Sequence, residues 1–165
     1  MSEERLRRVR DRVRPFPDFP EPGVLFRDIS PLLKDPVAFR TLIDLLEDHV
    51  RASFPEIDFI AGECWLNVPE ARAEQCVQCG VALRESALCS LQAELEIQSD
   101  AVEPGQKVVI VDDLLATGGT MCAACKLLKR LKAEILECLV IIELKSLKGS
   151  EKLNSIPFYS LLQYD

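Results

Sequence analysis

The fold of this chain is decided by residues 107–120, which read Lys107-Val108-Val109-Ile110-Val111-Asp112-Asp113-Leu114-Leu115-Ala116-Thr117-Gly118-Gly119-Thr120. After Lys107 come four consecutive β-branched residues with no polar alternation, which predicts a strand buried on both faces. Two adjacent carboxylates are expected to end that strand. Beyond the loop, apolar residues recur at helical spacing before a cationic end, so a helix is predicted there: Met121, Ala124, Leu128 and Leu131.

A strand, a glycine loop and a helix N-terminus together favour an anion site. Glycines let the backbone approach a phosphate closely, and N–H groups and threonine hydroxyls supply donors. The candidate phosphate-binding residues are Ala116, Thr117, Gly118, Gly119 and Thr120. The carboxylates of Asp112 and Asp113 suit the hydroxyls of a ribose, or a magnesium ion shared with one. The alternative is a plain turn into a helix that Thr117 or Thr120 caps.

Composition narrows the class of protein. A length of 165 residues predicts one domain, residues 1–165, and the net charge of −7 argues against a nucleic-acid partner. No apolar run reaches the length of a membrane span. Seven cysteines, an odd number without a signal sequence, predict free thiols and a cytoplasmic location. We expect a small-molecule substrate and no metal site built from protein groups alone.

The rest of the chain alternates between helical and strand patterns. An amphipathic helix is predicted before Pro15, and Asp35-Pro36 opens another. Between them, the proline- and phenylalanine-rich residues 16–31 predict an ordered loop over a pocket, or a linker packed on the core. Strands are predicted at 57–62, 93–98, 135–144 and, as an edge strand, 157–164. This alternation predicts an α/β fold with a mostly parallel sheet flanked by helices.

The motif Val-Val-Ile-Val-Asp-Asp-Leu-Leu-Ala-Thr-Gly-Gly-Thr resembles the phosphoribosyl-pyrophosphate motif of the type I phosphoribosyltransferases, in particular the adenine phosphoribosyltransferases. Residues 1–62 and 93–165 resemble that family, down to Phe-Arg-Asp-Ile-Ser-Pro and Ala-Glu-Leu-Glu-Ile-Gln. The resemblance implies the type I phosphoribosyltransferase fold, with an N-terminal hood over about residues 1–34. It also implies formation of AMP and pyrophosphate from adenine and phosphoribosyl pyrophosphate with Mg²⁺, by a homodimer.

The resemblance also implies an adenine site formed by Leu25, Phe26, Arg27 and Leu144. Backbone groups at Leu25 and Arg27 would read the adenine edge, and Phe26 would cover the ring. Asp112 and Asp113 would hold the ribose and Mg²⁺, beside the phosphate loop.

Residues 63–92 do not resemble the family. They lack its Asp-Ser-Arg-Gly pyrophosphate loop and the Ser-Leu-Glu-Tyr motif of its catalytic loop, so the resemblance identifies no catalytic residue. The segment itself predicts a helix at 69–79 and a strand at 81–83, which would complete another αβ unit. Two hypotheses stay open: a working enzyme whose middle segment supplies substitutes, or an impaired variant or splice form. The second would keep an AMP/ribose-phosphate half-site and act as a binding or dimer-partner chain.

Overall fold

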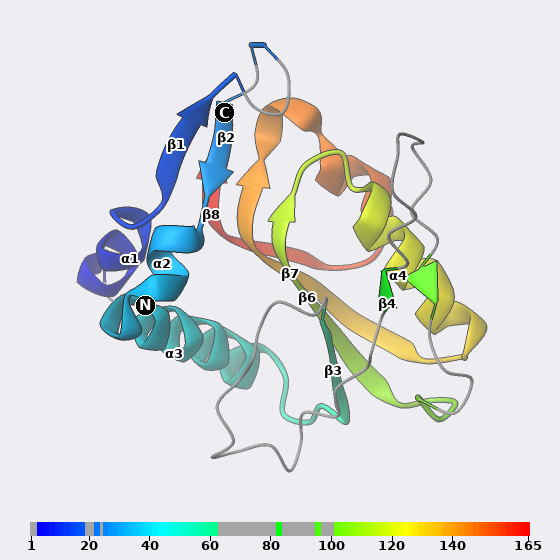
Figure 1. Cartoon of the computed structure of the whole chain (residues 1–165). Helices are drawn as coiled ribbons and strands as arrows, with labels where there is room; N and C mark the ends of the chain where they lie inside the picture. The colour runs from blue at the N-terminus through cyan, green and yellow to red at the C-terminus, as the bar shows by residue number, and fades with distance from the viewer. Residues whose placement is uncertain (1–2, 19–21, 24, 63–81, 84–94, 97–100) are drawn as a thin grey trace. The chain divides into compact units, whose positions relative to one another are not determined.

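A computed structural model of the chain describes residues 3–18, 22–23, 25–62, 82–83, 95–96 and 101–165 (Figure 1). The chain divides into two compact units, Met1–Pro55 and Glu56–Asp165. One domain over residues 1–165, with a hood over about residues 1–34, stays a prediction.

The first unit is mostly helical. Its elements are α1 (Glu3–Arg10), β1 (Arg14–Pro17), β2 (Leu25–Asp28), α2 (Ser30–Lys34) and α3 (Pro36–Ser53). Glutamates open α1 and arginines close it, as the helix dipole favours. The predicted N-terminal helix is therefore confirmed, and its Val9 is fully buried. Arg5 Nη1 lies 2.7 Å from Asp48 Oδ2, which ties α1 to α3.

The start of α3 follows the predicted capping pattern. The Asp35 carboxylate accepts hydrogen bonds from the N–H groups of Val37 and Ala38, at 3.0 and 3.1 Å, and Pro36 occupies the first helical position. The buried face of α3 consists of Ala38, Thr41, Leu42, Leu45 and Leu46.

Residues 14–28 contain a short antiparallel hairpin, where the sequence predicts a loop. Phe16 pairs with Phe26 and Arg14 with Asp28. The loop was predicted at residues 16–31, so that prediction is wrong for six of the eight paired residues, 16–17 and 25–28. Each strand is only four residues long, and a two-stranded sheet tolerates prolines because both of its strands are edges.

The second unit holds a four-stranded parallel sheet. Its elements are β3 (Phe59–Gly62), β4 (Ala82–Leu83), β5 (Leu95–Glu96), β6 (Lys107–Leu115), α4 (Gly119–Arg130), β7 (Glu134–Leu144), the 3₁₀ helices η2 (Lys145–Leu147) and η3 (Gly149–Leu153), and β8 (Phe158–Tyr164). The strand order is β3-β6-β7-β8, and all three pairings are parallel. The predicted α/β fold is confirmed, and among the described strands β8 lies at an edge of the sheet, as expected.

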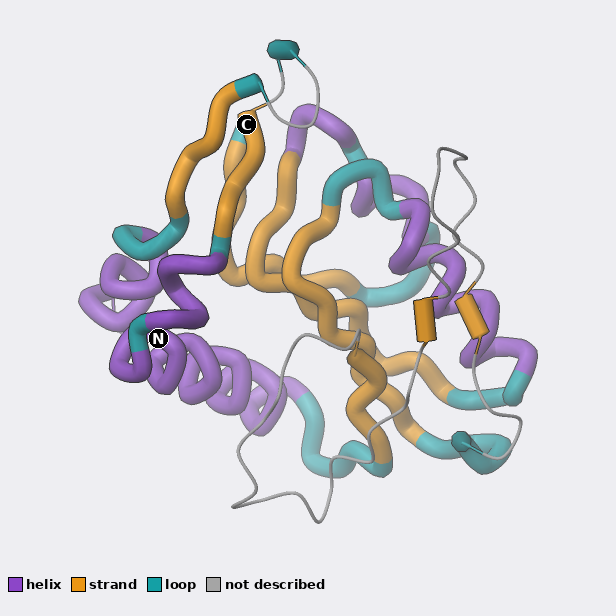
Figure 2. The backbone as a smooth tube through the Cα atoms, in the orientation of Figure 1, coloured by secondary structure: helices purple, strands orange, loops and turns teal. Residues whose placement is uncertain are grey.

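Two short strands form a separate sheet. β4 and β5 pair antiparallel, with Ala82 opposite Glu96 and Leu83 opposite Leu95 (Figure 2). Strands are therefore present within the predicted ranges 81–83 and 93–98. In the described part of the chain they join each other rather than the parallel sheet, so they do not extend it as another αβ unit. The helix predicted at 69–79 lies outside the described residues.

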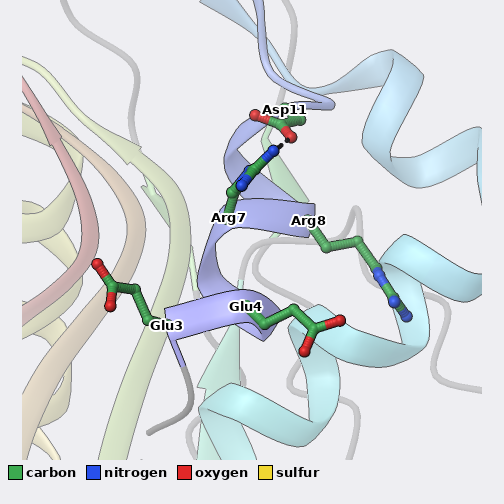
Figure 3. A pocket seen from close by; sticks show the side chains of 5 residues that line it. All are labelled: Glu3, Glu4, Arg7, Arg8 and Asp11. Atoms are coloured by element: carbon green, nitrogen blue, oxygen red, sulfur yellow. Dashed lines mark ion pairs between the residues drawn. The ribbon is translucent and has the colours of Figure 1, made fainter.

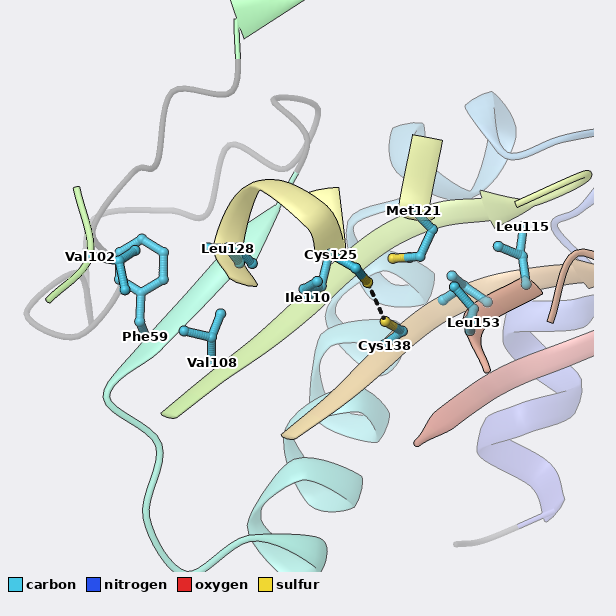
Figure 4. Close-up of a cluster of buried hydrophobic side chains, with 12 residues drawn as sticks. Phe59, Val102, Val108, Ile110, Leu115, Met121, Cys125, Leu128, Cys138 and Leu153 are labelled. Carbon is cyan, nitrogen blue, oxygen red and sulfur yellow. Dashed lines mark hydrogen bonds between the residues drawn. The ribbon is translucent and has the colours of Figure 1, made fainter. Parts of the chain in front are cut away.

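The core of the second unit lies where α4 packs on β6 and β7 (Figures 1 and 4). Its buried members come mainly from these elements and include Val108, Ile110, Leu115, Met121, Cys125, Leu128, Cys138 and Leu153. The sulfur atoms of Cys125 and Cys138 lie 3.5 Å apart. No helix among the described residues is long and apolar enough to cross a membrane.

Candidate functional site

The glycine loop is anchored at both of its ends. β6 extends through Asp112 and Asp113 to Leu115, so the two carboxylates lie within the strand rather than ending it. Leu115 is 1% exposed and Met121, in the first turn of α4, is 2% exposed, and both belong to the core. The loop Ala116–Gly118 between them is therefore held by buried side chains, while Thr117, Gly119 and Thr120 are exposed.

Gly118 is the N-cap of α4 and has a positive φ of 76°. The alternative that Thr117 or Thr120 caps this helix is therefore wrong. Gly118 has no side chain that could bond the N–H groups of the first turn, so these groups remain available to a ligand. An exposed helix N-terminus of this kind suits an anion, and the loop geometry fits the predicted phosphate site.

A second glycine lies against the loop. A Cβ atom added to Gly149 would lie 2.9 Å from the Gly118 nitrogen and would also meet the Ala116 carbonyl oxygen. The 3₁₀ helix η3, which begins at Gly149, therefore packs against the candidate phosphate loop Ala116–Gly118 through backbone contact. Gly149 was not among the residues predicted for this site, because it lies far from the loop in sequence.

The two aspartates precede the loop and are both half-buried. Oδ1 of Asp112 accepts a hydrogen bond from the Asp113 N–H at 2.8 Å, which fixes the orientation of that carboxylate. Among the described residues, no three His, Cys, Asp or Glu side chains cluster closely enough to hold a metal ion. Two carboxylates do fit an Mg²⁺ ion whose other ligands are substrate phosphates and water.

The end of β7 supplies a carboxylate that sequence reasoning missed. Glu143 is 6% exposed and accepts hydrogen bonds from Ser150 Oγ at 2.8 Å and Ser160 Oγ at 3.0 Å. The available signal was one charged residue inside the apolar run that ends β7. Leu144, predicted as an adenine contact, follows it and is 8% exposed.

The other predicted adenine contacts lie in the first unit, on β2. Leu25 is 43% exposed, and Phe26 and Arg27 are half-buried. The structure therefore brings these three residues together on one strand, while Leu144 belongs to the second unit.

Asp28 fixes the end of β2. It accepts a hydrogen bond from the Ser30 N–H at 2.8 Å and another from Arg14 Nε at 3.1 Å. The bonds from Ser30, aided by the Arg14 guanidinium, lower the pKa of Asp28 to about 2. This carboxylate is therefore charged at neutral pH and joins both strands of the hairpin.

A hollow beside α1 is lined by Glu3, Glu4, Arg7, Arg8 and Asp11 (Figure 3). Arg7 Nε lies 3.8 Å from Asp11 Oδ2, and both side chains are mostly exposed. The lining mixes both signs of charge on an exposed helix surface and includes no predicted site residue. We assign it no role in binding.

Comparisons with known proteins place these features in a family. The phosphoribosyl transferase domain model matches residues 83–162, which include β6, the glycine loop, α4 and β7. The adenine phosphoribosyltransferase of Rattus norvegicus is 57% identical over 181 residues, and that of Mus musculus is 56% identical over 180, each covering 100% of both chains. Since both spans exceed the 165 residues of this chain, the alignments contain gaps here.

Solved structures give the same result. The adenine phosphoribosyltransferase of Saccharomyces cerevisiae, in complex with D-2,5-dideoxy-2,5-imino-altritol 1,6-bisphosphate and adenine, is 33% identical with a TM-score of 0.79. The match covers 98% of this chain and 100% of that one. The enzyme from Thermoanaerobacter pseudethanolicus is 34% identical with a TM-score of 0.76, over 96% and 99% of the two chains.

Proposed function

Since this chain belongs to the adenine phosphoribosyltransferase family, we propose that it converts adenine and phosphoribosyl pyrophosphate into AMP and pyrophosphate. It is a transferase of a pentosyl group. The observation that carries the proposal is the loop Ala116–Gly118, anchored after two carboxylates, in a chain that matches its relatives over its full length. The impaired-variant alternative is not favoured, because the alignments to these enzymes cover the whole chain.

The reaction replaces one bond at the anomeric carbon of the ribose. Adenine N9 forms a bond to that carbon, pyrophosphate leaves with the electron pair of the broken C–O bond, and the N9 proton passes to solvent. The N–H groups at the start of α4 would bind the 5-phosphate, and Asp112 and Asp113 would bind the ribose hydroxyls. Holding both reactants in line supplies much of the rate in a displacement of this kind.

The hairpin register supports the adenine contacts. Leu25 lies opposite Pro17 and Arg27 lies opposite Pro15, and proline has no N–H to donate. The ladder bonds therefore fall at the Phe16–Phe26 and Arg14–Asp28 pairs, and the backbone groups of Leu25 and Arg27 point away from β1. Backbone groups that point outward suit recognition of the adenine edge, with Phe26 covering the ring and Leu144 as a further contact.

Three further properties complete the proposal. Mg²⁺ would enter with phosphoribosyl pyrophosphate, where it would neutralise the leaving group next to Asp112 and Asp113. The family resemblance favours a homodimer. A cytoplasmic location agrees with the three described cysteines, all of which are free thiols: Cys122, Cys125 and Cys138.

The test uses the purified full chain with adenine, phosphoribosyl pyrophosphate and Mg²⁺. Chromatography measures the AMP that forms. We expect turnover that needs both substrates and stops when the metal is chelated. Thermal unfolding with and without AMP is measured on the same sample. Stabilisation by AMP without turnover would overturn the proposed enzyme activity and support the impaired-variant hypothesis. Neither turnover nor stabilisation would overturn both.

A further inference from the structure

Glu143 is a buried carboxylate that the proposed chemistry does not use. Its side chain lies at the carboxyl end of β7, where Glu143 is the register partner of Leu115, the residue before the phosphate loop. Withdrawing a charged carboxylate from water is unfavourable unless hydrogen bonds replace the lost hydration. Here two serine hydroxyls replace it, one from η3 and one from β8. An apolar residue would cost less at this position, so the charge indicates a positional role.

The two serines lead to different parts of the unit. Ser160 lies on β8 and accepts a further hydrogen bond from Gln163 Nε2 at 3.0 Å, so this side belongs to the sheet edge. Ser150 follows Gly149, whose backbone contacts Ala116 and Gly118 of the phosphate loop. The hydrogen bond from Ser150 to Glu143 therefore lies one residue along the chain from Gly149, the residue that contacts the loop.

The backbone of η3 needs such a restraint. The residues on either side of it, Lys148 and Asn154, have positive φ angles of 51° and 56°. Residues other than glycine rarely adopt such angles. The far end of η3 is held by Leu153, which is 2% exposed in the core, and by the Cys122 thiol on the Lys152 carbonyl oxygen at 3.5 Å. Beside Gly149, η3 is restrained by the hydrogen bond that Ser150 Oγ donates to the Glu143 carboxylate.

We propose that Glu143 is a positioning residue for phosphoribosyl transfer. Through Ser150, its carboxylate fixes Gly149 against the loop Ala116–Gly118 and so fixes the direction of the N–H groups that receive the phosphate. This inference rests on the proposed function. It assigns Glu143 no contact with substrate.

The two serines provide a matched pair of variants. Ser150→Ala removes the bond toward Gly149, and Ser160→Ala removes the bond toward β8, while each leaves the carboxylate one hydroxyl donor. For Ser150→Ala we expect the KM for phosphoribosyl pyrophosphate to rise about tenfold, with the KM for adenine within about twofold of the original. Ser160→Ala should leave both KM values within about twofold.

A conservative change at Glu143 tests the mechanism directly. In Glu143→Gln, the amide oxygen accepts from one serine and the amide nitrogen donates to the other, because hydroxyls rotate to suit. This variant should stay within about threefold of the original KM for phosphoribosyl pyrophosphate, while Glu143→Ala should match or exceed the loss in Ser150→Ala. Thermal unfolding is recorded for each. A lowered melting temperature in Ser150→Ala with unchanged KM values would overturn the positioning role.

Direct binding separates this inference from the function on which it rests. Calorimetry gives the Kd of AMP for the unmodified chain, Ser150→Ala and Ser160→Ala, with no need for turnover. An affinity for AMP about tenfold weaker in Ser150→Ala alone supports the positioning role, even if the chain makes no AMP. The absence of AMP formation would overturn only the proposed enzyme activity. Equal affinities in all three chains overturn the positioning role and leave the enzyme intact. An unmodified chain that neither binds nor turns over overturns both.

Discussion

Gly118 and Gly149 are in backbone contact, and neither has room for a side chain. A Cβ atom added to Gly118 would lie 2.6 Å from the Gly149 carbonyl oxygen, well inside any contact that real Cβ atoms make. The loop Ala116–Gly118 and η3 therefore contact each other directly through their backbones. The position of the loop N–H groups depends on this contact, since no side chain lies between the two segments to absorb a change.

The first prediction concerns Gly118→Ala. The new methyl group meets a carbonyl oxygen, and alanine is strained at a φ of 76°, so we expect a stability loss of about 2–4 kcal/mol and a KM for phosphoribosyl pyrophosphate raised at least about tenfold. The control is Gly105→Ala, where φ is 88° and no atom lies within 4 Å of the added Cβ. It should lose about 1 kcal/mol and keep its KM. Denaturant unfolding and initial rates measure both, and equal effects on KM would contradict the contact argument.

The second prediction concerns the aspartates before the loop. Asp112→Asn and Asp113→Asn keep the size of each side chain and remove its charge, so we expect kcat/KM to fall about 10²-fold in each as Mg²⁺ and ribose contacts weaken. The matched control is Glu103→Gln, an exposed carboxylate of the same unit, which should stay within about twofold. Raising the Mg²⁺ concentration should recover part of the lost rate. Unchanged rates in both aspartate variants would remove these residues from the proposed site.

The third prediction concerns pH and the hairpin. The pKa of Asp28 in the folded chain is about 2, below its ordinary value of 3.8, because Ser30 and Arg14 bond its charged form. A lowered pKa means that this carboxylate stabilises the fold above pH 4, and that its contribution disappears as the pH falls from about 4 to 2. In Asp28→Asn the melting temperature should be lower at pH 7 and should fall less steeply across that window. Thermal unfolding from pH 7 to pH 2 measures this, and parallel curves would contradict it.

The sequence predicted those parts of the fold that depend on local pattern. The apolar run of β6, the helical spacing after it and the Asp35 cap each involve residues a few positions apart, so local rules suffice. The hairpin was not predicted, because its strands exist only by pairing with each other across a connection rich in proline. The pattern of residues 135–144 predicts a strand, but it does not indicate which groups Glu143 contacts.

The sequence predicts the candidate phosphate loop only as far as its own motif extends. Residues 116–120 follow the strand as expected, but their support comes from Gly149, which is distant in sequence. The partners of Glu143 are likewise 7 and 17 residues away along the chain. A sequence motif identifies the residues that meet a ligand, whereas the contacts that hold the motif in place are tertiary and leave only a faint signal, such as one charge in an apolar strand.

The last prediction concerns cysteine reactivity around α4. The hydrogen bond with Cys125, together with burial, raises the pKa of the Cys138 thiol, and the same bond lowers the pKa of Cys125. The thiolate is the reactive form, but Cys125 is only 4% exposed and Cys138 is 0% exposed, so exclusion of reagent should outweigh the lowered pKa of Cys125. Cys122, which is half-buried, should therefore react with iodoacetamide at pH 8 at least about tenfold faster than either. Mass spectrometry with fragmentation of peptides 108–126 and 133–145 resolves the three sites, because Cys122 and Cys125 share the first peptide. Labelling in denaturant, which should equalise the rates, serves as the control. Rapid labelling of Cys138 in the folded chain would mean that α4 does not pack on β7 as described.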